Sequence, residues 1–227
     1  MSPLLESSVE LLIFDCDGVL VDSELIANRL LQQGLRELGL SLTLQETMDR
    51  FMGKSLASCE AELAQQIGKK IDPAFWQRLR IKTFAAFDSD LKPVPGVENA
   101  LANLHLPKCV ASSGKKLKMR KTLGLTGLLS YFDNNLFSAT EVEQGKPAPD
   151  LFLYAAEKMN CAPGHCVVIE DSQYGVEAGV NAGMRVLGYC RHSSAELLTQ
   201  KGAVVFDDMR DLPDLIDALS KPEKEDD

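Results

Sequence analysis

The sequence predicts an α/β protein: a Rossmann-like parallel sheet core with helices on both faces and an inserted α-helical cap. Three observations predict this fold. Short apolar segments alternate with helical patterns, which is typical of βαβ units and a parallel sheet. Several of these segments lack polar alternation, as expected for strands covered by helices on both faces. A long helical stretch interrupts the alternation directly after the first strand.

The core elements are predicted in chain order. The strands are expected at 9–14, 108–112, 135–138, 165–169, 184–189 and 203–206, with the weakest pattern at 135–138. The intervening helices are expected at 97–105, 115–125, 150–160, 173–182 and 193–201. Strands that are separated by helices in this way belong to one parallel sheet.

The cap is predicted at residues 23–90, inserted into a core domain made of residues 1–22 and 91–220. Its four helices are expected at Ser23–Leu38, Leu44–Phe51, Ser55–Ile67 and Pro73–Phe87. Gly39, Gly53 and Gly68 fall near their ends, where helices commonly stop. The proline-containing segment 90–96 suits a stiff connection back to the sheet. Residues 221–227 are predicted to be a disordered tail.

Composition excludes several classes of function. A net charge of −9 over 227 residues argues against broad binding to nucleic acid or to anionic membranes. No apolar run approaches membrane-spanning length, and residues 1–10 lack the features of a signal peptide. The six cysteines show no CxxC or zinc-type spacing. We therefore expect a cytoplasmic protein, a monomer, with neither nucleic acid nor membrane as its partner.

The strongest single motif is Asp15-Cys16-Asp17-Gly18, which directly follows the apolar run 9–14. Ligands of open α/β sheets bind at the carboxyl ends of the strands, and unpaired acids there are costly to desolvate. Such acids bind a cation, attack a substrate or move a proton. The alternative is a polar turn in which an aspartate caps a helix.

Three further polar signals lie at the ends of predicted strands. Ser112-Ser113-Gly114, followed by two lysines, offers hydroxyls and free amides that suit phosphate oxygens. Lys146 lies in the segment GKPAPD, whose prolines stiffen the loop around the charge. Glu170-Asp171 is a second acid pair after a strand.

Together these signals place four acids, a lysine and a hydroxyl at one edge of the sheet. Clustered carboxylates repel each other, so a cation must offset them, and oxygen-rich sites suit Mg²⁺. With this metal and the lysine, the site can accept a phosphoryl group and neutralise the charge that develops on it.

The segments DCDGVLVDSE, VASSG, KPAPD and VVIEDSQYGVEAGVNAGM resemble the four signature motifs of the haloacid dehalogenase (HAD) superfamily. The resemblance covers residues 9–190, with the helical insertion where that family places its cap. The chain is most similar to the β-phosphoglucomutase-like and sugar-phosphatase branch, and within it to 6-phosphogluconate phosphatase-like members.

The resemblance implies a role for each motif residue. Asp15 would be the nucleophile that forms an aspartyl-phosphate. Asp17 would protonate the leaving oxygen and later activate water, with its backbone carbonyl on Mg²⁺. Gly18 would allow close approach of the backbone to the phosphoryl group.

The other motifs would complete the site. Ser112, with Ser113 beside it, would bind the phosphoryl group, and Lys146 would hold both that group and the nucleophile. Glu170 and Asp171 would complete the Mg²⁺ site that begins with Asp15 and Asp17.

Three other functions are possible for a chain with these motifs. A 2-haloacid dehalogenase lacks the second aspartate, so Asp17 argues against it. A phosphohexomutase of the β-phosphoglucomutase type carries a histidine and a cap arginine where this chain has Ala27 and Leu56. A non-enzymatic binding module should have lost a catalytic acid or the lysine, and none is missing. A phosphatase is therefore favoured.

The expected substrate is a small phosphorylated metabolite, a sugar or sugar-acid phosphate. Lys54 lies at a cap turn expected to face the core. With Lys115 or Lys116 it is a candidate to bind an anionic group of the substrate. The competing interpretation is an ordinary solvated lysine, and it is favoured for Lys116.

Overall fold

The computed structural model describes residues 8–52, 54, 56–132 and 135–220. Within them the strands form one six-stranded sheet of order β3-β2-β1-β4-β5-β6, and all neighbouring strands are parallel. The strands are β1 (Leu11–Phe14), β2 (Lys108–Ser112), β3 (Leu136–Ser138), β4 (Cys166–Glu170), β5 (Arg185–Tyr189) and β6 (Val204–Phe206). This topology confirms the predicted Rossmann-like α/β core and places β1 between β2 and β4.

Helices cover both faces of the sheet. They are α5 (Val97–Asn103), α6 (Lys116–Leu125), α7 (Asp150–Lys158), α8 (Gln173–Asn181), α9 (Ala195–Gln200) and α10 (Leu212–Ser220). Buried residues of α5, α6 and α10 join one apolar cluster, and those of α7, α8 and α9 join another. The sheet therefore separates two hydrophobic cores.

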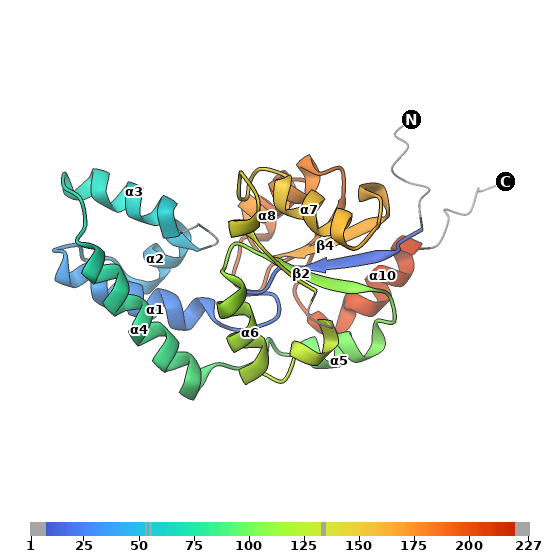
Figure 1. Ribbon diagram of the computed structural model, residues 1–227, viewed down its shortest axis with the longest axis horizontal. Helices are drawn as coiled ribbons and strands as arrows, with labels where there is room; N and C mark the ends of the chain where they lie inside the picture. The colour runs from blue at the N-terminus through green and yellow to red at the C-terminus, as the bar shows by residue number, and fades with distance from the viewer. Residues whose placement is uncertain (1–7, 53, 55, 133–134, 221–227) are drawn as a thin grey trace.

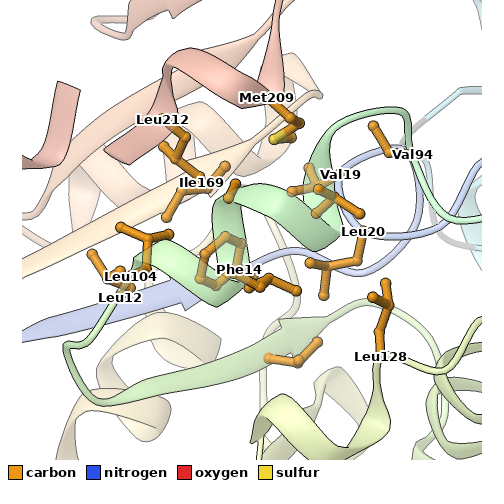
Figure 2. Packing of buried hydrophobic residues seen from close by; sticks show 14 of the residues in the cluster. Leu12, Phe14, Val19, Leu20, Val94, Leu104, Leu128, Ile169, Met209 and Leu212 are labelled. Carbon is orange, nitrogen blue, oxygen red and sulfur yellow. The ribbon is translucent and has the colours of Figure 1, made fainter. Parts of the chain in front are cut away.

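The sequence of the central strand β1 is apolar throughout because both of its faces are buried. Successive side chains of a strand point to opposite faces. Leu12 and Phe14 enter the cluster beside α5 and α10, whereas Leu11 and Ile13 enter the other cluster. Figure 2 shows Phe14 among side chains from neighbouring elements. Each such buried side chain contributes about 1.5–3 kcal/mol to folding.

A third apolar cluster lies in the helices that follow β1. They are α1 (Glu24–Glu37), α2 (Leu44–Phe51), α3 (Leu56–Ile67) and α4 (Pro73–Asp90). Residues of all four contribute to this cluster, which is separate from the two clusters of the sheet. In Figure 1 these helices lie beyond the carboxyl end of β1. Helical packing of residues 24–90 thus supports the predicted cap; the exact domain boundaries stay a prediction.

Helix ends in this region follow local signals. Thr43 and Glu46 form a reciprocal capping box at the start of α2. Asp72 caps α4 through the amide of Ala74, and Pro73 occupies the first turn, where its missing amide hydrogen is not needed. Gly39 and Gly68 have positive φ after α1 and α3.

The structure differs from the predicted elements in two respects. Helix α10 was not predicted, although Leu212, Leu215, Ile216 and Leu219 have helical spacing; a proline in its first turn is tolerated. Strand β1 begins at Leu11 rather than at residue 9, and helix ends shift by one to three residues. The predicted tail at 221–227 and Gly53 lie outside the described residues. No helix in the described part of the chain is long and apolar enough to span a membrane.

Candidate active site

The parallel register brings three of the sequence motifs to one edge of the sheet. Phe14, the last residue of β1, pairs with Val110 of β2 and Ile169 of β4. The amide of Asp15 continues this pairing by donating to the carbonyl of Ile169 at 2.9 Å. The loops after β1, β2 and β4 therefore leave the sheet side by side. In open α/β sheets, ligands bind at the carboxyl ends of the strands where the strand order reverses, and β1 lies at that point.

Lys146 is the cation at the centre of this edge. Its Nζ lies 2.5 Å from Asp15 Oδ1 and 2.6 Å from Glu170 Oε1, and it donates to the carbonyl of Ala111 at 3.2 Å. The lysine side chain is only 3% exposed. Burial favours the neutral amine, but the two carboxylates outweigh it and raise the pKa of Lys146. Lys146 is therefore a fixed positive charge beside the predicted nucleophile.

The Asp15 carboxyl lies in an environment that disfavours its charge. Burial, opposed by Lys146 and reinforced by the charges of Glu170 and Asp17, raises the pKa of Asp15 to about 7. One lysine does not neutralise the acids gathered here. Additional positive charge at this edge would stabilise the ionised form that a nucleophile requires.

Asp171 has the same deficit of positive charge. Burial first, and then the charges of Glu170 and Asp15, raise the pKa of Asp171 well above its usual range. Its side chain is buried, and its backbone carbonyl accepts a hydrogen bond from Ser193 Oγ at 2.5 Å. A buried carboxylate beside other carboxylates is costly unless a cation or a donor offsets its charge.

Gly18 explains how Asp171 approaches the first motif. Its φ is +82°, a left-handed conformation that favours glycine. A Cβ at this position would lie 2.0 Å from Asp171 Oδ2, so no larger side chain fits without displacing the acid. The glycine of the DxDG motif is thus required for the close approach of the two loops.

Glu170 is bound through both of its oxygens. Oε1 contacts Lys146, and Oε2 accepts from the amide of Ser172 at 2.9 Å and from its hydroxyl at 3.0 Å. The Cα of Gly175 packs so closely that an added Cβ would lie 1.8 Å from Oε1. Glu170 therefore anchors Lys146 in the structure, and its predicted role as a metal ligand stays a prediction.

Asp17 has two donors that the sequence did not single out. Ser23 Oγ donates to Oδ1 at 2.5 Å, and Lys118 Nζ lies 2.8 Å from Oδ2. Burial raises the pKa of Asp17, but Lys118 and the hydrogen bonds from Lys118 and Ser23 lower it more, so that it lies below its usual value. The position of Lys118 in the first turn of the helix that follows Ser112 is a sequence feature that could have indicated this contact.

The loop after β2 is preorganised by its own hydrogen bonds. The hydroxyl of the buried Ser112 accepts from the amide of Gly114 at 3.1 Å, and Ser138 Oγ donates to the carbonyl of Gly114 at 2.8 Å. Ser113 is half-buried in this loop. Lys115 occupies the N-cap position of α6 without a side-chain capping hydrogen bond, and it is exposed. This arrangement keeps Ser112 at the edge where the predicted phosphoryl group would bind.

The remaining predicted lysines have acidic partners of their own. Lys116 Nζ lies 2.8 Å from Glu141 Oε1 on the protein surface, in keeping with a structural role. Lys54 Nζ lies 2.7 Å from Glu62 Oε2, with its side chain 20% exposed. Burial opposes the charge of Lys54, but the hydrogen bond to Glu62 outweighs it and raises the pKa of Lys54. Tyr174 of α8 makes a smaller contribution in the same direction. The prediction that Lys54 faces the core stays a prediction.

The chemistry of the donor set fits a hard divalent cation. The described residues contain no cluster of three or more His, Cys, Asp or Glu side chains arranged to hold a metal. The buried carboxyls of Asp171 and Asp15, whose pKa values are raised by burial and by neighbouring acids, would nevertheless be stabilised in their ionised form by a cation. Two carboxylates and a backbone carbonyl suit Mg²⁺, which keeps several waters and takes few protein ligands.

Residues 12–189 match the sequence profile of the family described as haloacid dehalogenase-like hydrolase. The match spans strands β1 to β5, the helical insertion and all the residues of the site, and it ends before β6. The chain therefore belongs to the haloacid dehalogenase-like hydrolases.

Comparisons with individual proteins refine this assignment. The chain is 31% identical over 210 residues to 6-phosphogluconate phosphatase of Escherichia coli (strain K12), covering 92% of this chain and 95% of that protein. A haloacid dehalogenase-like protein of unknown function from Agrobacterium tumefaciens matches at a TM-score of 0.83 and 32% identity, covering 94% and 100%. A HAD family hydrolase from Deinococcus radiodurans with bound phosphate and sodium matches at 0.77 and 31%, covering 96% and 100%.

These comparisons confirm the resemblance seen in the sequence. The chain lies in the sugar-phosphatase branch of the superfamily and is a hydrolase that acts on phosphate monoesters.

Proposed function

We propose that this protein is a Mg²⁺-dependent phosphatase that hydrolyses a small sugar or sugar-acid phosphate through an aspartyl-phosphate on Asp15. The observation that carries the proposal is the contact of the buried Lys146 with Asp15 at 2.5 Å. A buried cation beside a carboxylate at the carboxyl-terminal edge of a sheet can both bind the phosphate dianion and orient the nucleophile.

In the proposed first step, a carboxylate oxygen of Asp15 attacks phosphorus. The bond between phosphorus and the leaving oxygen breaks. Asp17 has a low pKa in the free protein, so it first takes up a proton from solvent as the substrate binds and then gives that proton to the leaving oxygen. Lys146 and the Ser112 hydroxyl stabilise the charge on the phosphoryl oxygens. Splitting the hydrolysis into two displacements in this way replaces one difficult step by two easier ones.

In the proposed second step, water attacks the phosphorus of the aspartyl-phosphate and Asp17 takes a proton from that water. The products are inorganic phosphate and free Asp15. Asp15, Asp171 and the backbone carbonyl of Asp17 would hold Mg²⁺, which when bound supplies positive charge to the phosphoryl oxygens. Asp17 acts first as acid and then as base, so a single residue serves both steps.

The choice of substrate class rests on the family branch and on the cap. The Escherichia coli relative is a phosphatase of 6-phosphogluconate, a sugar-acid phosphate. Lys54 of the cap supplies a cation that suits a second anionic group on such a substrate. The direct test is a screen of phosphorylated metabolites for release of inorganic phosphate in the presence of Mg²⁺.

The second candidate function is a phosphohexomutase, and it makes a different product. Ala27 on α1 offers no general base, and Leu56 stands where the mutases carry their phosphate-binding arginine. We expect incubation with β-glucose 1-phosphate and a trace of glucose 1,6-bisphosphate to release inorganic phosphate or to leave the sugar unchanged. Rapid build-up of glucose 6-phosphate with little free phosphate would refute the phosphatase proposal.

Substitution of Lys54 tests its proposed contact with substrate. We expect Lys54→Ala to raise KM about tenfold, and to lower kcat less, because a charge-assisted contact made before the reaction is lost. Arg50→Ala is the matched control, since Arg50 also pairs with Glu62, at 2.5 Å. Equal increases in KM for both variants would show that the effect comes from Glu62 and the cap rather than from substrate.

A further inference from the structure

The carboxylate of Asp17 is held from two sides. Lys118 Nζ, from the first turn of α6, lies 2.8 Å from Oδ2, and Ser23 Oγ, just before α1, donates to Oδ1 at 2.5 Å. Each oxygen therefore has its own donor, and the two donors come from different elements of the chain. Such paired contacts restrict rotation of a carboxyl group far more than either contact alone.

Lys118 is itself held in place. Its side chain is 28% exposed, and its ammonium lies 5.9 Å from the ring centre of Phe87, a residue of α4 that is 1% exposed. Among the described residues, Asp17 is the only carboxylate within 4 Å of this ammonium. An ordered lysine has given up much of the rotamer freedom of a solvated one, so the contact is directed rather than incidental.

The charges nearby explain why Asp17 needs this partner. Lys146 is already shared between Asp15 and Glu170. Glu24, at the start of α1, adds another carboxyl: burial and then the charge of Asp17 raise the pKa of Glu24 to about 7. Without Lys118, the Asp17 carboxylate would be repelled by these neighbouring acids and would be free to turn away from the substrate.

We propose that Lys118 is a positioning residue that keeps the Asp17 carboxyl directed at the leaving oxygen of the substrate. The inference rests on the proposed acid and base role of Asp17. When the bond from phosphorus to the leaving oxygen breaks and the bond to Asp15 forms, the proton that Asp17 took up on substrate binding moves to the leaving oxygen. Asp17 is then an anion beside the Lys118 ammonium until it takes a proton from the attacking water.

The test compares two kinds of leaving group. Lys118→Met removes the ammonium and keeps the length of the side chain. We expect kcat/KM to fall about 100-fold for the best alkyl phosphate found in the metabolite screen, which needs a proton to leave. For p-nitrophenyl phosphate, whose leaving group departs without a proton, we expect a change of less than about threefold.

Matched variants isolate the action through Asp17. Lys121→Met, one turn further along α6, removes an ammonium that pairs with Asp88 at 2.8 Å and should change neither substrate. Lys118→Arg should restore part of the activity on the alkyl phosphate. In an Asp17→Asn background, Lys118→Met should cause little further loss, because residues that act as a unit are not additive.

Several outcomes would overturn the proposal. They are equal losses on both substrates, no loss on either, or full additivity with Asp17→Asn. Lys118→Gln repeats the comparison if the methionine variant does not fold, as judged by circular dichroism and thermal melting. If Asp17→Asn shows no selectivity between the substrates, the proposed role of Asp17 fails instead, and a wild type inactive on all phosphate monoesters refutes the proposed function itself.

Discussion

Asp15→Asn is expected to reduce phosphatase turnover at least about 1000-fold, because the amide cannot act as the nucleophile in the first displacement. The exchange alters hardly any volume, so substrate binding and the surrounding loops should persist. Release of inorganic phosphate, followed over long incubations at high enzyme concentration, measures the residual rate. A variant with near wild-type activity would refute the assignment of Asp15 as nucleophile.

The same substitution should leave the fold intact. The raised pKa of Asp15, about 7, shows that its ionised form is disfavoured by burial and neighbouring acids. Asparagine removes that charge, and Lys146 keeps Glu170 at 2.6 Å as a partner. The thermal midpoint of Asp15→Asn should therefore be no lower than that of wild type. Asp208→Asn, which alters a half-buried aspartate paired with Arg210 outside the site, is the control and should retain full activity.

Removal of divalent metal is expected to have the second largest effect. In excess chelator, activity should fall at least about 100-fold, and added Mg²⁺ should restore it, because one lysine cannot offset the charges of Asp15 and Asp171. Phosphate release before and after addition of Mg²⁺ gives the measurement. Full activity in excess chelator would instead point to a mechanism that needs no metal.

Thermal melting provides a readout of metal binding that does not depend on catalysis. At a Mg²⁺ concentration about 100 times Kd, binding adds about 2.7 kcal/mol of stability, which corresponds to about 5–10 °C in a domain of this size. Asp171→Asn should reduce this shift strongly, whereas Asp208→Asn should preserve it. An equal shift in the Asp171 variant would show that Mg²⁺ binds elsewhere.

Much of the fold followed from local patterns. The alternation of apolar segments and helices predicted every strand of the sheet, because burial on both faces leaves a continuous apolar run that is visible in the sequence. Boundaries were less exact, as for β1, because helix and strand ends depend on capping and packing. Helix α10 was missed, since its short apolar pattern has a proline in its first turn and the helix packs in the same cluster as Met209 and Leu104.

Motif residues could likewise be found from the sequence, because Asp15, Ser112 and Asp171 lie at or directly after strand ends. Parallel strands necessarily bring their carboxyl ends to one edge of the sheet. Residues that directly follow these strands in the sequence therefore lie close together in the structure.

Lys146 was predicted from its motif, but only the tertiary structure decided which lysine after Ser112 reaches that edge. Lys115 and Lys116 follow Ser112 most closely, yet Lys115 is exposed and Lys116 pairs with Glu141. Lys118, 101 residues from Asp17 in the chain, reaches its carboxylate instead. The physical reason is that the direction of a side chain in a helix's first turn depends on where that helix begins and how it packs, and neither is encoded in spacing alone.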